Sequence, residues 1–251
     1  MFLASIFAVF LLIPLNGSAS TLKLVTLQYP PYEFEKDGEI KGIAVEIIRE
    51  AFSRMNQPIT ISLHPWATAL GQIENGEADA IFTAFKTSER EKFADYSREV
   101  LLTQTISLFV GKKSNMTFDG DLRKMNRYAF GVVLNISYGS IFDDAVKNGI
   151  ITKLVISDSA EVNMHRLLEG SFDILVSNTF GAMDILRKMD AQDHVKQLKP
   201  SIQRVPSYIA FSKKNNLISV RDRFDRILQE MIKDGSYNRI VKSYFDKGTL
   251  H

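Results

Sequence analysis

The chain has 251 residues, of which 45% are hydrophobic and 24% are charged, and its 31 basic and 29 acidic residues leave a formal net charge of +2. This is ordinary globular composition, sufficient for one large or two small hydrophobic cores. The charges are interspersed and form no basic stripe, which argues against binding to nucleic acid or to an anionic membrane.

The N-terminus predicts an export signal. Residues 2–15 are apolar except for Ser5, and the small residues Gly17 and Ala19 that follow suit signal peptidase. The apolar run is shorter than the ~20 residues of a membrane span. We expect residues 1–19 to be a cleaved signal peptide, although no Lys or Arg precedes the apolar run; a buried N-terminal helix is the alternative. No cysteine follows for a lipid anchor, so the expected location is the periplasm.

Strand-like and helix-like segments alternate from residue 22 onward, which predicts an α/β architecture. The first series has expected strands at 22–27, 59–63, 78–85 and 105–110, with helices at 42–55 and 66–75. After a polar crossover at 111–115, the second series has strands at 128–134, 154–156 and 172–177, with helices at 138–147, 161–168 and 181–188. An extended segment at 200–212 and amphipathic helices at 221–233 and 237–245 complete the prediction.

The most informative stretch runs from Trp66 to Arg90. The spacing of its apolar residues predicts a helix that ends at Gly76, and the apolar run after it predicts a strand covered on both faces. Thr87 and Ser88 could then start a helix with Arg90 in its first turn, where a cation is unfavourable for the helix dipole. Arg90 therefore predicts a partner, and a carboxylate ligand suits its planar fork. The alternative is a surface arginine paired with a neighbouring acid.

These segments resemble the bacterial extracellular solute-binding proteins, family 3, which are polar amino acid receptors of ABC importers. The resemblance rests on segments that follow one another in the order of the family: 29–34, 42–46, 76–81 with Thr87, Arg90, Phe93 and 96–97, 131–138, 235–237 and 242–245. It covers nearly all of the chain after residue 20.

The resemblance implies a two-lobed periplasmic-binding-protein fold of type II. One lobe would comprise residues 20–110 and 206–251 and the other residues 111–205, joined by two hinge crossings near 110 and 206, with a ligand cleft between the lobes. It further implies a monomer that captures a small polar, amino acid-like solute for an ABC permease in the inner membrane. No catalytic residue, cofactor or metal is expected.

The resemblance also assigns roles at the cleft. Arg90 would hold the ligand α-carboxylate with help from Thr87, while an aromatic residue before the first helix would pack on the ligand side chain. The full set of candidates is Arg90, Thr87, Tyr29, Tyr32, Trp66, Phe85, Thr83, Ser137, Tyr138 and Asn178. Each also has a structural interpretation: packing for the aromatic residues, a satisfied strand position for Thr83, and helix capping for Thr87 and for Ser137, whose helix start with Tyr138 could bind an anion.

Asn178 departs from the family pattern. The family commonly has an aspartate here that pairs with the ligand α-ammonium, and an amide supplies no charge. Either another acid replaces it, with Glu33 and Asp143 as possibilities, or the ligand lacks a full amino acid head group.

Two other functional classes stay open. Enzymes such as cyclohexadienyl dehydratases share this scaffold, and so do sensory modules that present a ligand to a membrane receptor. The four histidines are far apart in the sequence, so a metal site is not expected.

Overall fold

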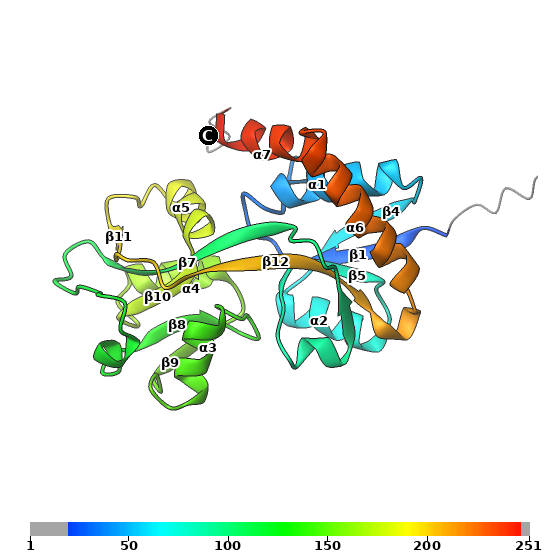
Figure 1. Ribbon diagram of the computed structural model, residues 1–251. Helices are drawn as coiled ribbons and strands as arrows, with labels where there is room; N and C mark the ends of the chain where they lie inside the picture. The colour runs from blue at the N-terminus through cyan, green and yellow to red at the C-terminus, as the bar shows by residue number, and fades with distance from the viewer. Residues whose placement is uncertain (1–19, 247–251) are drawn as a thin grey trace, which may run out of the picture.

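The computed structural model describes residues 20–246, so the predicted signal peptide lies outside the described part of the chain. Two lobes lie side by side and are joined by the long strands β7 (Leu102–Gly111) and β12 (Gln203–Ser212), as Figure 1 shows. Ten strands form one sheet: eight follow the order β4-β1-β5-β12-β7-β10-β8-β9, while β11 pairs with β7 and β6 pairs with β12. No helix among residues 20–246 is both long and apolar enough to cross a membrane.

The first lobe is built around the parallel strands β1, β4 and β5. Every residue of β5 is buried, as expected for a strand covered on both faces. Neighbouring residues alternate between faces: Leu24 and Phe82 pack with α1, α6 and α7, whereas Val25 and Ile81 pack with α2. The elements of this lobe are β1 (Leu22–Thr26), α1 (Ile43–Arg54), β4 (Ile59–Leu63), α2 (Trp66–Asn75), β5 (Ala80–Phe85), β6 (Ala94–Tyr96), α6 (Ile218–Lys233) and α7 (Ser236–Asp246).

The second lobe repeats this arrangement around the parallel strands β8, β9 and β10. Helix α3 packs on the face that includes Ile174 and Val176, whereas α4 and α5 pack on the face that includes Leu175. The elements are β8 (Phe130–Val133), α3 (Ser140–Lys147), β9 (Leu154–Ser157), α4 (Ala160–Leu168), β10 (Ile174–Asn178), α5 (Thr179–Lys188) and β11 (Val195–Gln197).

The two crossings lie within strands. Strand β7 pairs with β12 through residues 102–106 and with β10 through residues 106–109. Ile106, Leu108 and Val110 already pack in the core of the second lobe. We therefore propose that the lobes divide in the middle of β7 and β12.

The predicted helices and strands occur at or near the expected positions, with three differences. Segment 34–41 forms a hairpin of β2 (Phe34–Lys36) and β3 (Glu39–Lys41), which the sequence analysis did not identify. The short strands β6 and β11 were also missed, because three residues are too few to show a periodic pattern. The helix expected after Thr87 is only the 3₁₀ turn Arg90–Lys92.

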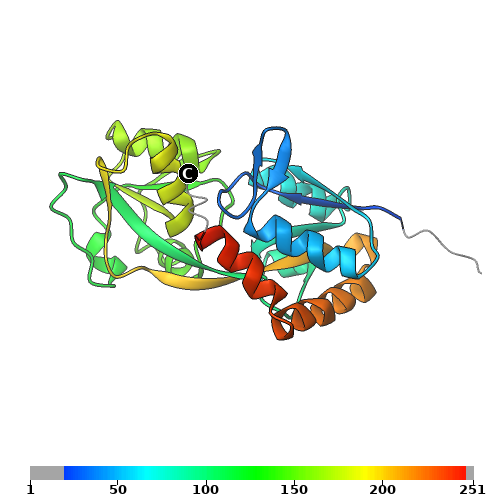
Figure 2. The ribbon, with the colours of Figure 1, turned by 90° about the horizontal axis from the view of Figure 1, so that it is seen from above.

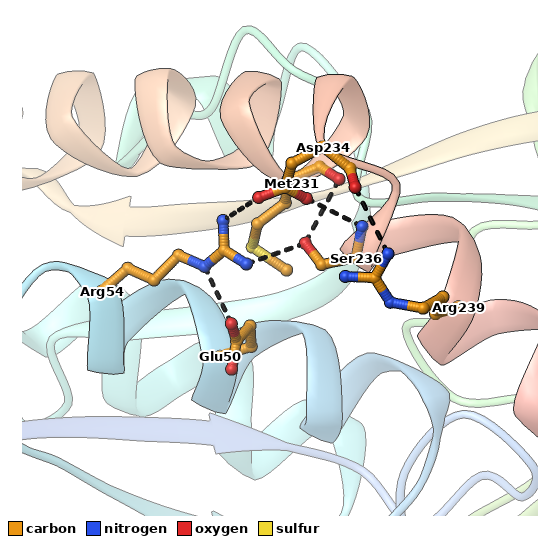
Figure 3. Close-up of polar contacts among 6 residues, drawn as sticks. All are labelled: Glu50, Arg54, Met231, Asp234, Ser236 and Arg239. Carbon is orange, nitrogen blue, oxygen red and sulfur yellow. Dashed lines mark hydrogen bonds and ion pairs between the residues drawn. The ribbon is translucent and has the colours of Figure 1, made fainter.

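The C-terminal helix α7 packs against α1 and α6, and its end lies toward the second lobe in both views (Figure 2). A polar cluster attaches it (Figure 3): Arg54 on α1 donates to Glu50 at 2.8 Å, to Asp234 at 2.6 Å and to Ser236 Oγ at 2.9 Å. Because Asp234 and Ser236 form the turn between α6 and α7, one guanidinium links three helices.

We expect Arg54→Ala to lower the Tm by about 2–4 °C, because it removes three hydrogen bonds at a half-buried turn. Differential scanning calorimetry measures the change. Arg49→Ala, at an exposed position of the same helix, is the matched control and should leave the Tm unchanged. Equal effects of both substitutions would contradict the role of the cluster.

Candidate functional site

A cavity of about 60 Å³ lies between the lobes, where the carboxyl ends of β1, β5, β8 and β10 meet. Polar side chains line it in an otherwise apolar wall, as is usual for small-molecule sites. Of the predicted site residues, the lining includes Tyr29, Trp66, Thr83, Phe85, Arg90, Ser137, Tyr138 and Asn178. Its space corresponds to only a few water molecules, so a ligand the size of an amino acid requires the lobes to move apart first.

The loop from Tyr29 to Glu33 enters the cavity from the first lobe. Its backbone carbonyl groups accept hydrogen bonds from the first N–H groups of α1: Ile43 N donates to Pro31 O at 3.0 Å, and Ala44 N donates to Tyr32 O at 2.9 Å. This close approach requires glycine at position 42, where a Cβ would lie 2.1 Å from Tyr32 O. The start of α1 thus binds the loop, and the loop places Tyr29 and Glu33 at the cavity.

Strand β5 contributes Thr83 through a bulge. The pairing of β5 with β12 shifts register between Tyr208 and Ala210, and Thr83 has a φ of 59°. A β-branched residue rarely adopts this left-handed conformation, which costs of order 1–3 kcal/mol. The bulge directs the Thr83 hydroxyl to the Glu33 carboxyl, 2.7 Å away.

Arg90 is buried, with 7% of its surface exposed, and lines the cavity. Its Nη1 donates to Phe85 O at 3.0 Å, its Nη2 donates to Asn135 O of the second lobe at 2.9 Å, and its guanidinium stacks 5.2 Å from the Trp66 ring centroid. Burial lowers the pKa of Arg90, but an arginine stays protonated at neutral pH. It forms no ion pair with a carboxylate among residues 20–246, which leaves its charge for a ligand.

Two polar groups of the lining are buried and lack a hydrogen-bond partner in the described part of the chain: Glu33 Oε2 and Trp66 Nε1. Glu33 is 1% exposed, and burial raises its pKa well above the ordinary value. Unpartnered buried acceptors and donors are costly. Both atoms therefore mark where a ligand with a donor and an acceptor would be stabilised.

The second lobe contributes the segment before α3. Ser137 Oγ donates to Asp143, and Tyr138 N donates to the same carboxyl at 2.9 Å. Burial raises the pKa of Asp143. The carboxyl of Asp143 thus accepts from the backbone N–H at Tyr138, the kind of group that the sequence analysis expected to bind an anion from outside. The helix itself begins at Ser140, two residues after the predicted start. Tyr138 is a core residue that accepts a hydrogen bond from Val133 N at 2.7 Å.

Asn178 lines the cavity, but its amide is engaged within the protein. Its Oδ1 accepts from Gly181 N at 3.1 Å and so caps α5, while its Nδ2 donates to Gln104 at 2.8 Å and to Tyr32 OH at 3.3 Å. Both amide hydrogens are therefore used. Tyr32 is outside the lining and acts through this contact, since its ring packs in the first-lobe core.

Thr87 is also outside the lining, and its hydroxyl accepts from Arg90 N at 3.3 Å. The sequence analysis missed Gln104 and Ser177 as cavity residues and treated Glu33 only as a possibility. An acid next to Pro-Pro-Tyr, in a loop of aromatic residues, was the available signal for Glu33. No local sequence pattern indicates that Gln104 and Ser177 line the cavity, because the pairing of their strands with other strands places them there.

Tyr29 connects the lobes directly. Its hydroxyl lies 2.8 Å from Ser177 Oγ and accepts from Asn178 N at 3.2 Å. Burial raises the pKa of Tyr29 to about 12, so the hydroxyl is neutral at physiological pH. Its ring lies against Gly181, where a Cβ would approach the ring to 2.7 Å. The absence of a side chain at 181 therefore permits this contact between the lobes.

Comparison with known proteins agrees with this geometry. The model of the bacterial extracellular solute-binding proteins, family 3, matches residues 22–247. The chain belongs to this family. A "Probable histidine-binding protein" of Neisseria gonorrhoeae is 23% identical over 223 residues, covering 88% of this chain and 81% of that protein.

Two solved structures share the two-lobed, type II fold of this solute-binding protein. A histidine kinase sensor domain with similarity to periplasmic binding proteins has a TM-score of 0.81 at 19% identity, covering 90% of this chain and 96% of that one. An ancestral arginine-binding protein bound to arginine has a TM-score of 0.78 at 20% identity, and the match covers 91% of this chain and 99% of that one.

A second space of about 350 Å³ continues the cavity of this family member toward the surface. The half-buried Glu161 and the exposed Asp158 lie at its rim beside His64. The two spaces share the residues Leu27, Tyr29, Trp66, Val133, Ile136 and Ala160. A ligand held in the inner cavity could thus extend a side chain outward along an apolar wall to an acidic rim.

We expect Gly181→Ala to weaken ligand binding by roughly tenfold, because the added methyl group meets the Tyr29 ring and opposes closure of the lobes. Small-angle scattering should show a larger radius of gyration than for the wild type. Gly71→Ala is the control: position 71 lies in α2 with no atom within 4 Å of the added Cβ, so neither quantity should change. A compact Gly181→Ala protein with unchanged affinity would contradict this role of Gly181.

Glu33 makes the stability of the empty protein depend on pH. Its pKa in the folded protein lies above the ordinary 4.5, so the native state keeps a proton that the unfolded chain has lost. The free energy of unfolding should therefore fall as the pH rises from the unfolded pKa through the folded pKa, with a slope approaching about 1.4 kcal/mol per pH unit. Urea denaturation at several pH values measures the slope. Glu33→Gln should remove this component, and Glu35→Gln, in the adjacent strand β2, should retain it. Equal slopes in both variants would show that the carboxyl of Glu33 is not the cause.

Proposed function

We propose that this solute-binding protein captures an amino acid in the periplasm, after export through the predicted signal at residues 1–19, and delivers it as a monomer to an ABC permease. One observation supports this most directly: the cavity contains one buried guanidinium without a carboxylate partner in the described residues and one buried carboxyl with an unpartnered oxygen. A zwitterion supplies the complement of both. The α-carboxylate would bind Arg90, and the α-ammonium would bind Glu33.

This arrangement resolves the absence of an aspartate at position 178. Glu33 would supply the negative group from the opposite lobe. Asn178 instead donates hydrogen bonds to Gln104 and Tyr32, which fixes the positions of these two side chains. Binding of the α-carboxylate replaces the Asn135 carbonyl at Arg90 Nη2. A charged acceptor is the stronger partner for a guanidinium, so the exchange favours the ligand.

The mouth of the cavity favours a basic or neutral polar side chain. Asp158 and Glu161 lie at the rim, while Trp66 and Tyr29 offer aromatic faces for a cation. Relatives support this choice by their names, which include histidine- and arginine-binding proteins. We therefore expect affinity to decrease from basic through neutral to acidic amino acids.

A thermal-shift panel of the standard L-amino acids tests the proposal. L-Arginine or L-histidine should raise the Tm of the wild type, and Arg90→Ala should abolish the shift because the carboxylate loses its bidentate partner. Arg98→Ala, which removes an exposed arginine paired with Asp222, should keep it. Arg90→Lys, which retains the charge, should bind weakly and serves as a second variant if Arg90→Ala does not fold. A shift that survives in both Arg90 variants would refute the carboxylate role.

The similarity to a kinase sensor domain favours a second candidate, in which the ligand-bound protein contacts a membrane receptor. Uptake of radiolabelled L-arginine by cells with and without the gene separates the two. Loss of uptake supports the importer, whereas normal uptake with loss of a transcriptional response supports the receptor. We assign no catalysis to the site; turnover of prephenate or arogenate by the purified protein would overturn that assignment.

A further inference from the structure

The contacts of the Thr83 hydroxyl bear on the protonation state of Glu33. Thr83 Oγ1 lies 2.7 Å from Glu33 Oε1 and 2.6 Å from Phe82 O. Both separations are those of O–H···O hydrogen bonds, so each needs a proton between its two oxygens. A carbonyl has no proton and a hydroxyl has one. When Thr83 donates to Phe82 O, the proton of the other bond must come from the Glu33 carboxyl.

Thr26 carries the other hydroxyl beside this pair. Its Oγ1 lies 3.3 Å from Phe82 O and 3.5 Å from Thr83 Oγ1, so its contacts with these two oxygens are longer than those of Thr83. Its interaction with Glu33, like that of Thr83, lowers the pKa that burial raises. Among residues 20–246, no lysine, arginine or histidine forms an ion pair with Glu33. If Thr83 donates to Phe82 O, the 2.7 Å contact with Glu33 suits a neutral acid that donates to Thr83 Oγ1.

Burial is the largest influence on Glu33: it raises the pKa of the carboxyl, whereas the hydroxyl groups of Thr83 and Thr26 lower it. Tyr29 and Tyr32 on its own loop are neutral phenols, since burial raises the pKa of both. Strands β7 and β10 contribute the uncharged amides of Gln104 and Asn178, and Arg90 is the one other charged residue in the lining. Arg90 stays charged; it donates to Phe85 O and Asn135 O and stacks on the Trp66 ring, without an ion pair to Glu33.

We propose that Glu33 carries a proton in the empty cavity and exchanges it for the ammonium group of an amino acid, so that binding releases one proton to the solvent. The proposal rests on the proposed function. The O–H bond of the carboxyl breaks and its proton goes to water. The carboxylate then binds the incoming ammonium through Oε2, the oxygen that has no partner in the described residues, while Thr83 turns its own proton toward Oε1. Burial raises the pKa of Glu33 in the empty site, and the ammonium reverses this effect.

The exchange has two consequences. Affinity for an amino acid should rise with pH, up to tenfold per pH unit, until it levels off above the pKa of Glu33 in the empty protein. It also penalises an anionic solute that carries a carboxylate but no cation, because such a solute leaves Glu33 protonated and forms no ion pair with it. Glu33 thereby selects for a cationic group without keeping an unpaired buried charge between binding events.

Infrared difference spectroscopy tests the first half of the proposal without any ligand. The wild type at pH 6 should show the carbonyl-stretch band of a protonated, non-hydrated carboxylic acid, and Glu33→Gln should lack it. Glu35→Gln, which removes an exposed acid two residues away, should retain it. Absence of the band in the wild type, or its persistence in Glu33→Gln, would overturn the proposal.

Calorimetry with L-arginine tests the second half. Titrations at pH 6 in buffers of different ionisation enthalpy should show release of nearly one proton per L-arginine for the wild type and Glu35→Gln, and none for Glu33→Gln. The Glu33→Gln protein should bind roughly 30-fold more weakly, as expected for loss of a charge-assisted hydrogen bond. Tight binding without proton release would overturn the exchange. Absence of L-arginine binding would count against the proposed amino acid ligand, and the infrared result would still decide the protonation of Glu33.

Discussion

The pairing of β7 with β12 is the constraint on which the remaining structure depends. These neighbouring antiparallel strands pass from one lobe to the other, pairing with each other at 102–106 and 203–207 and with β10 and β5 on either side. Both lobes extend from the same pair of strands (Figure 1), and the carboxyl ends of their parallel strands therefore meet at one cavity. Two strands resist shear but allow bending, so the same pairing that assembles the site also permits it to open.

The cavity combines this geometry with an electrostatic demand. A buried guanidinium and a buried carboxyl are both expensive to desolvate, and within residues 20–246 neither has an ionic partner. The protein lessens the cost differently at the two groups. Arg90 remains charged and is held by two carbonyl groups and an aromatic face, whereas burial raises the pKa of Glu33 and favours its neutral form. The zwitterionic ligand that we propose would satisfy both groups at once, and its binding would be coupled to closure of the lobes.

Contacts between the lobes involve the same groups that the proposed ligand would use. The Asn135 carbonyl occupies Arg90, and Tyr29 joins Ser177 and Asn178. These neutral hydrogen bonds are weaker than the ionic bonds that would replace them. The solved structures that share this fold include an arginine-binding protein and a sensor domain, with TM-scores of 0.78 and 0.81, so the fold serves both kinds of protein.

The sequence alone determined most of the architecture and part of the site. Hydrophobic periodicity located long elements such as α2 and β5, since these must bury a regular face, and the same stretch identified Arg90. Short elements such as β6 and the hairpin β2–β3 contain too few residues for a period to appear.

Only the tertiary structure decided how the candidates are used. It enclosed Glu33 next to Thr83, engaged the amide of Asn178 with Gln104 and Tyr32, and excluded Thr87 from the cavity lining. These outcomes depend on a bulge in β5 and on contacts between residues more than seventy positions apart, such as Asn178 with Gln104 and with Tyr32. Local propensity carries no information about such partners, and it is the partner that fixes the charge and the role of a buried polar group.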